Sequence, residues 1–158
     1  MKIFLFLIIS AFSFINVGNA QNIKKYKCMI QMTNYMGEGA YIVASIIDSK
    51  GNYVQTLYVL GSDKKWYPDI KEWYKAFKKK PTDISAITGA SISGGDRAVK
   101  IFEINEKYID KDYKLKFESA VENNVYKPED VLIPLTSASL SAKTDGNGYI
   151  RYVRFIPN

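Results

Sequence analysis

The fold is decided by the stretch Tyr41-Ile42-Val43-Ala44-Ser45-Ile46-Ile47, which leads through Asp48-Ser49-Lys50-Gly51-Asn52 into Tyr53-Val54-Gln55-Thr56-Leu57-Tyr58-Val59-Leu60. β-Branched and aromatic residues dominate both arms, and a polar cluster containing glycine separates them. This arrangement predicts a β-hairpin. Both faces of the first arm are apolar, so we expect residues 41–47 to form a central strand that is covered on each side.

Two further segments after the hairpin have the composition of strands. Residues 97–104 are rich in β-branched and aromatic side chains, and residues 113–119 alternate strictly. In the second segment Tyr113, Leu115 and Phe117 fall on one face, and charged residues fall on the other. The alternation predicts that the charged face of residues 113–119 meets water.

The end of the chain adds two strand signals and a turn. Pro134 lies in the apolar run 131–135, and because proline cannot donate to a ladder we expect this run at a sheet edge or a strand end. Asp145-Gly146-Asn147-Gly148 is typical of a turn, and it precedes a final strand over residues 149–156.

One segment of the chain has helical periodicity. Apolar residues recur at i, i+3, i+4 and i+7, at Ile70, Trp73, Tyr74 and Phe77. Pro68 suits a first helical turn, and Pro81 ends the pattern. The spacing predicts one amphipathic helix over about residues 68–80. Together with about seven short strands it predicts a mostly β domain, an antiparallel β-sandwich that resembles immunoglobulin domains in its layering.

The N-terminus has the features of a secretory signal peptide. Lys2 precedes the apolar run 3–15, and Gly18 and Ala20 supply small residues at a cleavage site. We expect cleavage after Ala20, which leaves residues 21–158 as a single domain. The apolar run is too short for a good membrane span. The mature protein is therefore expected to be periplasmic or secreted and not membrane-spanning.

The composition excludes several classes of function. The 158 residues include no histidine, so Ser/His and Cys/His nucleophile pairs and the usual zinc sites are absent. The formal net charge of +6 is mild, and nucleic acid is a poor partner for an exported protein. Cys28 is the single cysteine and favours a buried, inert thiol; a reactive thiol or an intermolecular disulfide is the alternative. No set of catalytic side chains is visible, so an electron carrier or a binding module is favoured over an enzyme.

The stretch with the clearest hint of chemistry runs from Asp83 to Gly95. Its core, Ala86-Ile87-Thr88-Gly89-Ala90-Ser91, resembles the D-A-x-[ST]-G-A-[ST] pattern at which extracytoplasmic flavoproteins carry FMN through its phosphate on the last hydroxyl. Gly89 and Ala90 add no bulk in front of Ser91, which we expect on an exposed turn. Position 85 holds Ser where the pattern has Asp. The other interpretation is a polar connection without a ligand.

Aromatic residues precede this stretch closely. Trp66 and Trp73 are most simply core residues that pack the helix against a sheet. The alternative is that one of them forms a wall on which a planar ligand stacks. Both belong to the segment that leads directly into the Thr88–Ser91 motif, so Trp66 and Trp73 join Thr88, Gly89, Ala90 and Ser91 as candidate cofactor-binding residues.

The order of these signals resembles a known bacterial family. The resemblance is carried by Tyr41-Ile42-Val43-Ala44, by Trp66, Pro68-Asp69 and Trp73, and by Ala86 to Ser91. These residues are similar to the exported family called domain of unknown function 2271. The resemblance implies a small periplasmic β-sandwich protein that accompanies a flavin transferase and a PepSY-type membrane redox protein.

Two functions follow as expectations. In the first, the protein is an accessory of an extracytoplasmic redox system that carries covalent FMN at Ser91 and passes electrons between a membrane donor and an outside acceptor. In the second, it is a binding module of the cell envelope without a cofactor.

Overall fold

The computed structural model describes residues 22–156, so the expected signal peptide, residues 1–20, lies outside the described part of the chain. The strands are β1 (Ile23–Met32), β2 (Tyr41–Ile47), β3 (Tyr53–Leu60), β4 (Thr88–Gly89), β5 (Arg97–Asn105), β6 (Lys114–Ala120), β7 (Lys127–Pro134), β8 (Lys143–Asp145) and β9 (Ile150–Ile156). The helix α1 (Lys71–Phe77) is accompanied by the short 3₁₀ helices η1 (Lys64–Asp69), η2 (Ser85–Ile87), η3 (Glu106–Tyr108) and η4 (Ser139–Ser141).

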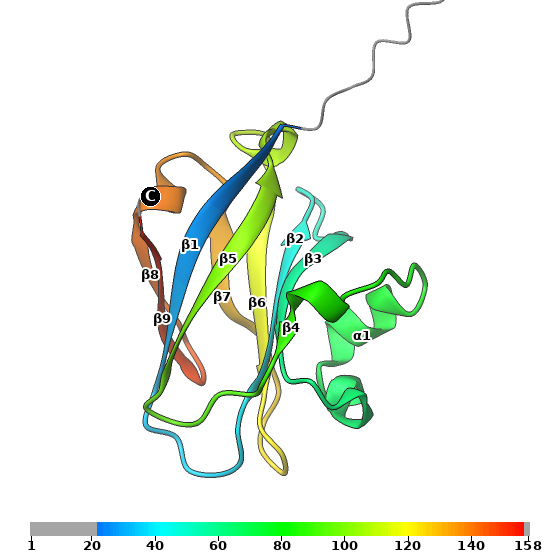
Figure 1. Cartoon of the computed structure of the whole chain (residues 1–158), viewed down its shortest axis with the longest axis vertical. Helices are drawn as coiled ribbons and strands as arrows, with labels where there is room; N and C mark the ends of the chain where they lie inside the picture. Colours follow the sequence, from blue (N-terminus) through cyan, green and yellow to red (C-terminus); the bar gives the residue numbers. More distant parts are fainter. Residues whose placement is uncertain (1–21, 157–158) are drawn as a thin grey trace, which may run out of the picture.

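The strands form two sheets that face each other, which confirms the predicted β-sandwich (Figure 1). One sheet has the order β5-β1-β9-β8, and the other has the order β4-β3-β2-β6-β7. All pairs are antiparallel except β3 and β4, which run parallel. The resemblance to immunoglobulin layering stays a prediction.

The predicted hairpin is confirmed as β2 and β3, and β2 lies at the centre of its sheet. It pairs with β3 on one side and with β6 on the other, and all of its residues after Tyr41 are buried. Alternate residues point to different layers, so one face of β2 enters the core between the sheets and the other face meets α1. Fully buried aromatic residues, Phe102, Phe117 and Phe155, fill the core between the sheets.

The predicted helix has its expected face but different bounds. Ile70 and Trp73 are buried, and Tyr74 and Phe77 are half-buried against the outer face of the sheet. The segment divides into η1, which contains Pro68, and α1, because Ile70 has ψ of 74° and interrupts the helical backbone. The predicted helix of about residues 68–80 is confirmed, and its regular α-helical part spans Lys71–Phe77.

The prediction that one face of residues 113–119 meets water is wrong. Lys116 is 7% exposed and Glu118 is 2% exposed, although both lie on the charged face of β6. The reason is that α1 covers this outer face of the sheet (Figure 1). The charged residues of β6 are consequently held between a sheet and a helix.

The last strands agree with the sequence expectations. β7 is the edge strand of its sheet, and Pro134 is its final residue. The predicted turn joins β8 to β9, where the buried carboxylate of Asp130 accepts hydrogen bonds from the backbone N–H groups of Tyr149 and Ile150 at 2.9 and 3.0 Å. This carboxylate fixes the turn to the neighbouring sheet.

Cys28 is fully buried in β1, as the inert interpretation predicts, and burial raises the pKa of its thiol well above the usual range. Only the thiolate form of a cysteine attacks a disulfide reagent, so we expect no labelling of the native protein in a neutral buffer and complete labelling in denaturant. The measurement is the absorbance of the released thiolate from a chromogenic aromatic disulfide. Rapid labelling of the native protein, at the rate of a free thiol, would contradict the buried assignment.

Candidate functional site

The flavin-type motif lies at one edge of the five-stranded sheet. Thr88 and Gly89 form β4, which runs parallel to β3, and the Gly89 carbonyl accepts a hydrogen bond from the Gly61 N–H at 2.7 Å. An isolated bridge between Ala40 and Ile92 continues the backbone pairing after a short gap. The motif therefore combines the end of η2, the edge strand β4, and Ala90 and Ser91, which have no regular structure.

Ser91 lies between β4 and the Ile92 bridge, and its side chain is exposed. The expectation that its hydroxyl sits on a tight turn is wrong, because the turn falls at Gly94 and Gly95, where Gly95 has φ of +80°. Within residues 22–156 the Ser91 hydroxyl makes no hydrogen bond. The Ser91 hydroxyl is thus exposed to solvent and makes no hydrogen bond in the described structure.

Ser91 and Trp66 line the same small pocket, which has a volume of about 150 Å³. The remaining lining residues are Glu38, Gly39, Tyr41, Asp69, Ala120 and Glu122. Gly39 leaves the room that the serine needs, since a Cβ atom there would lie 2.6 Å from the Ser91 Oγ. Burial raises the pKa of the Tyr41 phenol, so it stays protonated beside the pocket. The structure therefore brings together two of the predicted residues, Ser91 and Trp66.

An acidic group lies close to the position where the flavin pattern has its aspartate. The Asp83 carboxylate accepts hydrogen bonds from the backbone N–H of Ser85 at 2.9 Å and from its hydroxyl at 2.7 Å. These two hydrogen bonds lower the pKa of Asp83, which keeps it ionised. A carboxylate from the side chain two residues earlier therefore lies beside Ser85.

The other residues of the motif have structural roles. The Thr88 hydroxyl donates to the Ile84 carbonyl at 2.7 Å, so it is committed to closing the turn of η2. Gly89 allows the edge to approach β3, because a Cβ atom there would lie 2.9 Å from the Tyr58 hydroxyl. Ala90 is exposed. Of the two hydroxyls in the motif, only that of Ser91 is free of a hydrogen bond in the described structure.

Trp73 does not face this site. It is 1% exposed, its indole N–H donates to the Thr56 hydroxyl at 2.8 Å, and its ring stacks on Phe77 with centroids 4.9 Å apart. A ring enclosed on all sides cannot act as a wall for a ligand. Trp73 is a core residue, and Trp66, which is half-buried at the pocket, is the remaining aromatic candidate.

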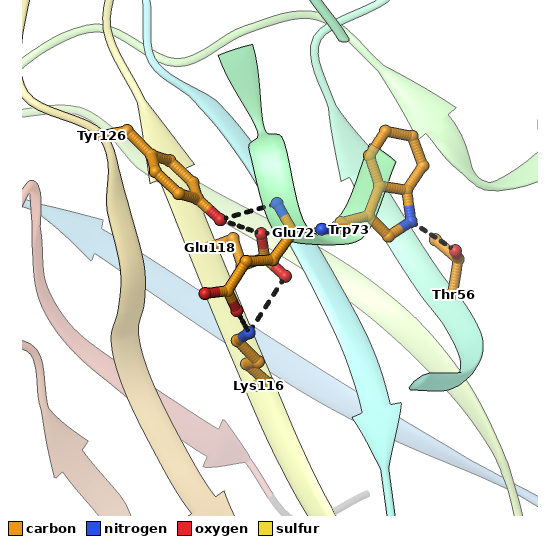
Figure 2. A network of polar contacts seen from close by, with 6 residues as sticks. All are labelled: Thr56, Glu72, Trp73, Lys116, Glu118 and Tyr126. Atoms are coloured by element: carbon orange, nitrogen blue, oxygen red, sulfur yellow. Dashed lines mark hydrogen bonds and ion pairs between the residues drawn. The ribbon is translucent and has the colours of Figure 1, made fainter. Parts of the chain in front are cut away.

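A polar network with a buried centre at Glu118 joins α1 to β6 (Figure 2). Glu118 accepts a hydrogen bond from the Trp73 backbone N–H at 3.0 Å and another from the Tyr126 hydroxyl. The Tyr126 hydroxyl also accepts from the Glu72 N–H at 3.1 Å. The Lys116 ammonium pairs with Glu72 and lies 3.4 Å from the second oxygen of Glu118.

The electrostatics of this network favour a structural role. Burial raises the pKa of Glu118, whereas the Tyr126 hydrogen bond and the charge of Lys116 oppose that rise. Burial acts to lower the pKa of Lys116, but Glu72 and Glu118 outweigh it and the net shift is upward. Burial raises the pKa of Tyr126 far above its usual range. None of these four side chains lines the Ser91 pocket, so the network supports α1 and adds no reacting group to the site.

Nothing in the described residues points to a metal centre. Between residues 22 and 156, no three His, Cys, Asp or Glu side chains lie close enough together to hold an ion. Nor does any helix in that range have the length and apolar character that a membrane span requires.

A comparison with protein families identifies residues 24–152 as a match to the family described as predicted periplasmic protein, DUF2271. The chain belongs to this family. Membership confirms the resemblance to DUF2271 and the expected periplasmic localisation, while the family description names no cofactor or partner. No curated protein and no solved structure matches this DUF2271 chain.

Proposed function

We propose that this DUF2271 protein carries FMN covalently on the Ser91 hydroxyl and serves as an electron carrier of the periplasm. The observation that carries the proposal is the exposed Ser91 Oγ, which makes no hydrogen bond in the described structure. Thr88, the other hydroxyl of the motif, is bonded to the Ile84 carbonyl. An acceptor hydroxyl must be accessible to a transferase, and the exposure of Ser91 supports this role.

The attachment reaction balances with a flavin adenine dinucleotide as donor. An ester bond forms between the Ser91 Oγ and the phosphorus of the FMN half, and the pyrophosphate bond of the dinucleotide breaks. AMP leaves, and the hydroxyl proton passes to a base of the transferase. The protein supplies the acceptor and the surroundings of the flavin, and the flavin supplies the redox chemistry.

The surroundings of Ser91 decide how the flavin lies. The pocket of about 150 Å³ is smaller than the roughly 300–1,000 Å³ of pockets that enclose a ligand, so the isoalloxazine ring rests on the surface. Trp66 lines this pocket, and the Lys65 ammonium lies over one face of its ring, 5.0 Å from the centroid, so a flavin could stack only on the other face. The acidic rim, Glu38, Asp69 and Glu122, repels the phosphodiester, which therefore points to solvent.

The proposal is tested by mass and fluorescence. We expect coexpression of the full chain with a flavin transferase to add the mass of FMN less water, and Ser91→Ala to abolish both this addition and in-gel flavin fluorescence. Ser93→Ala, a change to another exposed serine two residues away, is the matched control and should keep the label. An unmodified wild-type mass beside a labelled known substrate would refute the proposal, as would a label that persists in Ser91→Ala. The unmodified mass would favour the cofactor-free binding module.

A further inference from the structure

The edge of the four-stranded sheet is open along β5. In the described part of the chain β5 pairs only with β1, and the register runs without a bulge from Ile23 opposite Asn105 to Gln31 opposite Arg97. A long edge without a bulge or a proline presents unpaired N–H and C=O groups to any strand that approaches. The first half of β5 is also accessible on both faces, since Arg97 to Ile101 are all exposed or half-buried.

The outward face of this edge is apolar at its centre. Val99 and Ile101 are 47% and 46% exposed, which places them among the few large apolar side chains open to solvent between residues 22 and 156. A groove of about 850 Å³ runs beside β5, with Tyr58 of β3 and Ile87 of η2 on its far side. The groove gives an incoming strand room to pair with β5.

We propose that a second copy of this chain fills the edge, with β5 pairing antiparallel to β5 about a twofold axis at Lys100. Such an isologous contact brings each residue opposite the one equally far from the axis. Val99 then faces Ile101 of the second copy, and Arg97 faces Glu103 of the second copy, each pair occurring twice. The strand is thus complementary to itself in both charge and apolar surface.

The charged residues at this contact also interact with side chains of the neighbouring strand β1. Glu103 already pairs with Lys25 of β1 at 3.1 Å, and the Arg97 Nε–H donates to the Gln31 side chain at 3.0 Å. In the dimer each Glu103 lies between Lys25 of its own chain and Arg97 of the second copy. Opposite charges that face each other across strands stabilise a sheet.

The register with the axis at Lys100 is favoured because shifting the axis breaks the complementary pairs. Moving the axis to Ile101 places Val99 opposite Glu103 and Arg97 opposite Asn105, which removes both ion pairs and sets a carboxylate against an apolar side chain. The chosen register has one cost, because Lys100 then faces Lys100 of the second copy on the inner face. The Lys100 ammonium is drawn away from the axis, toward the Tyr58 ring, whose centroid lies 5.1 Å from it.

The first test is the mass of the protein in solution. We expect sedimentation equilibrium of the chain purified from the periplasm to show a concentration-dependent shift from the monomer mass to twice that mass. Ile101→Lys should abolish the shift, since it sets an ammonium against Val99 at the centre of the contact. Val125→Lys changes another exposed apolar residue, in a loop, and should leave the dimer unchanged. Lys100→Gln should tighten it at least several-fold by removing the like-charge pair.

A charge exchange tests the register itself. Arg97→Glu and Glu103→Arg should each be monomeric at concentrations where the wild type is dimeric, because each brings two like charges together twice. A mixture of the two variants should recover a heterodimer, since both of its rows then pair opposite charges. A monomer at every concentration, whatever else binds the edge, would overturn the proposal. A dimer that persists in Ile101→Lys would also overturn it. The same holds if the mixture of Arg97→Glu and Glu103→Arg stays monomeric while each variant has the melting temperature of the wild type. The proposal does not depend on the flavin, because Ser91→Ala should leave the dimer intact.

Discussion

Replacing Glu118 with alanine is expected to lower the free energy of unfolding by about 3–5 kcal/mol, the usual cost of breaking a buried ion pair by removing one partner. Glu118 is 2% exposed and accepts hydrogen bonds from the Trp73 backbone and from Tyr126 (Figure 2). Alanine leaves the buried Trp73 N–H and the half-buried Tyr126 hydroxyl without this acceptor. It also leaves Lys116, which is 7% exposed, with Glu72 as its only carboxylate in the network.

The measurement is equilibrium unfolding in urea, followed by circular dichroism. Glu129→Ala is the matched control, because this glutamate is exposed on β7 and its removal should cost less than about 0.5 kcal/mol. Adding Lys116→Met to Glu118→Ala should recover part of the loss, since no poorly paired ammonium then remains in the interior. A loss from Glu118→Ala that equals the control would show that the network carries no stability.

Periodicity in the sequence was sufficient to predict the elements whose neighbours are local. The hairpin of β2 and β3 follows from two β-rich arms around a turn, and both faces of β2 are buried as its composition indicates. The face of α1 follows from the spacing of Ile70, Trp73, Tyr74 and Phe77. The bounds of α1 did not follow, because the break at Ile70 is set by backbone angles that propensity does not specify.

The covering of β6 by α1 could not be predicted from the same periodicity, because the two segments are distant in the sequence. Residues Lys114, Lys116 and Glu118 alternate with apolar residues, and a strand with that pattern normally turns its charges to water. Here α1 covers Lys116 and Glu118, and Glu72 of α1 lies 44 residues before Lys116 in the chain. The ion pairs make the burial tolerable. The parallel pairing of β4 with β3 was missed for the same reason, because it joins residues that are distant in sequence.

The candidate site was predictable in part. The motif directs attention to Ser91, and the structure shows its hydroxyl exposed in a pocket shared with Trp66. Sequence proximity alone could not separate the two tryptophans. Trp66 lies in η1 and reaches the pocket, whereas Trp73 lies on the inward face of α1.

Replacing Trp73 with alanine is therefore expected to destabilise the fold without touching the pocket, at a cost of about 3–5 kcal/mol. The side chain is 1% exposed, stacks on Phe77 and packs edge-on against Tyr67 at a centroid distance of 5.2 Å. Its removal leaves a cavity between α1 and the sheet. Trp66→Ala removes a half-buried side chain and should cost less than half as much.

The indole hydrogen bond is separated from the packing by a third variant, Trp73→Phe. Thr56 keeps its contact with the Tyr53 hydroxyl at 2.8 Å in this variant, so the hydrogen bond lost with the indole should cost only about 1 kcal/mol. Phenylalanine also retains most of the ring contact with Phe77. Urea unfolding should therefore place Trp73→Phe well above Trp73→Ala in stability. Equal losses in the two variants would mean that the hydrogen bond to Thr56, more than the buried ring, holds α1 on the sheet.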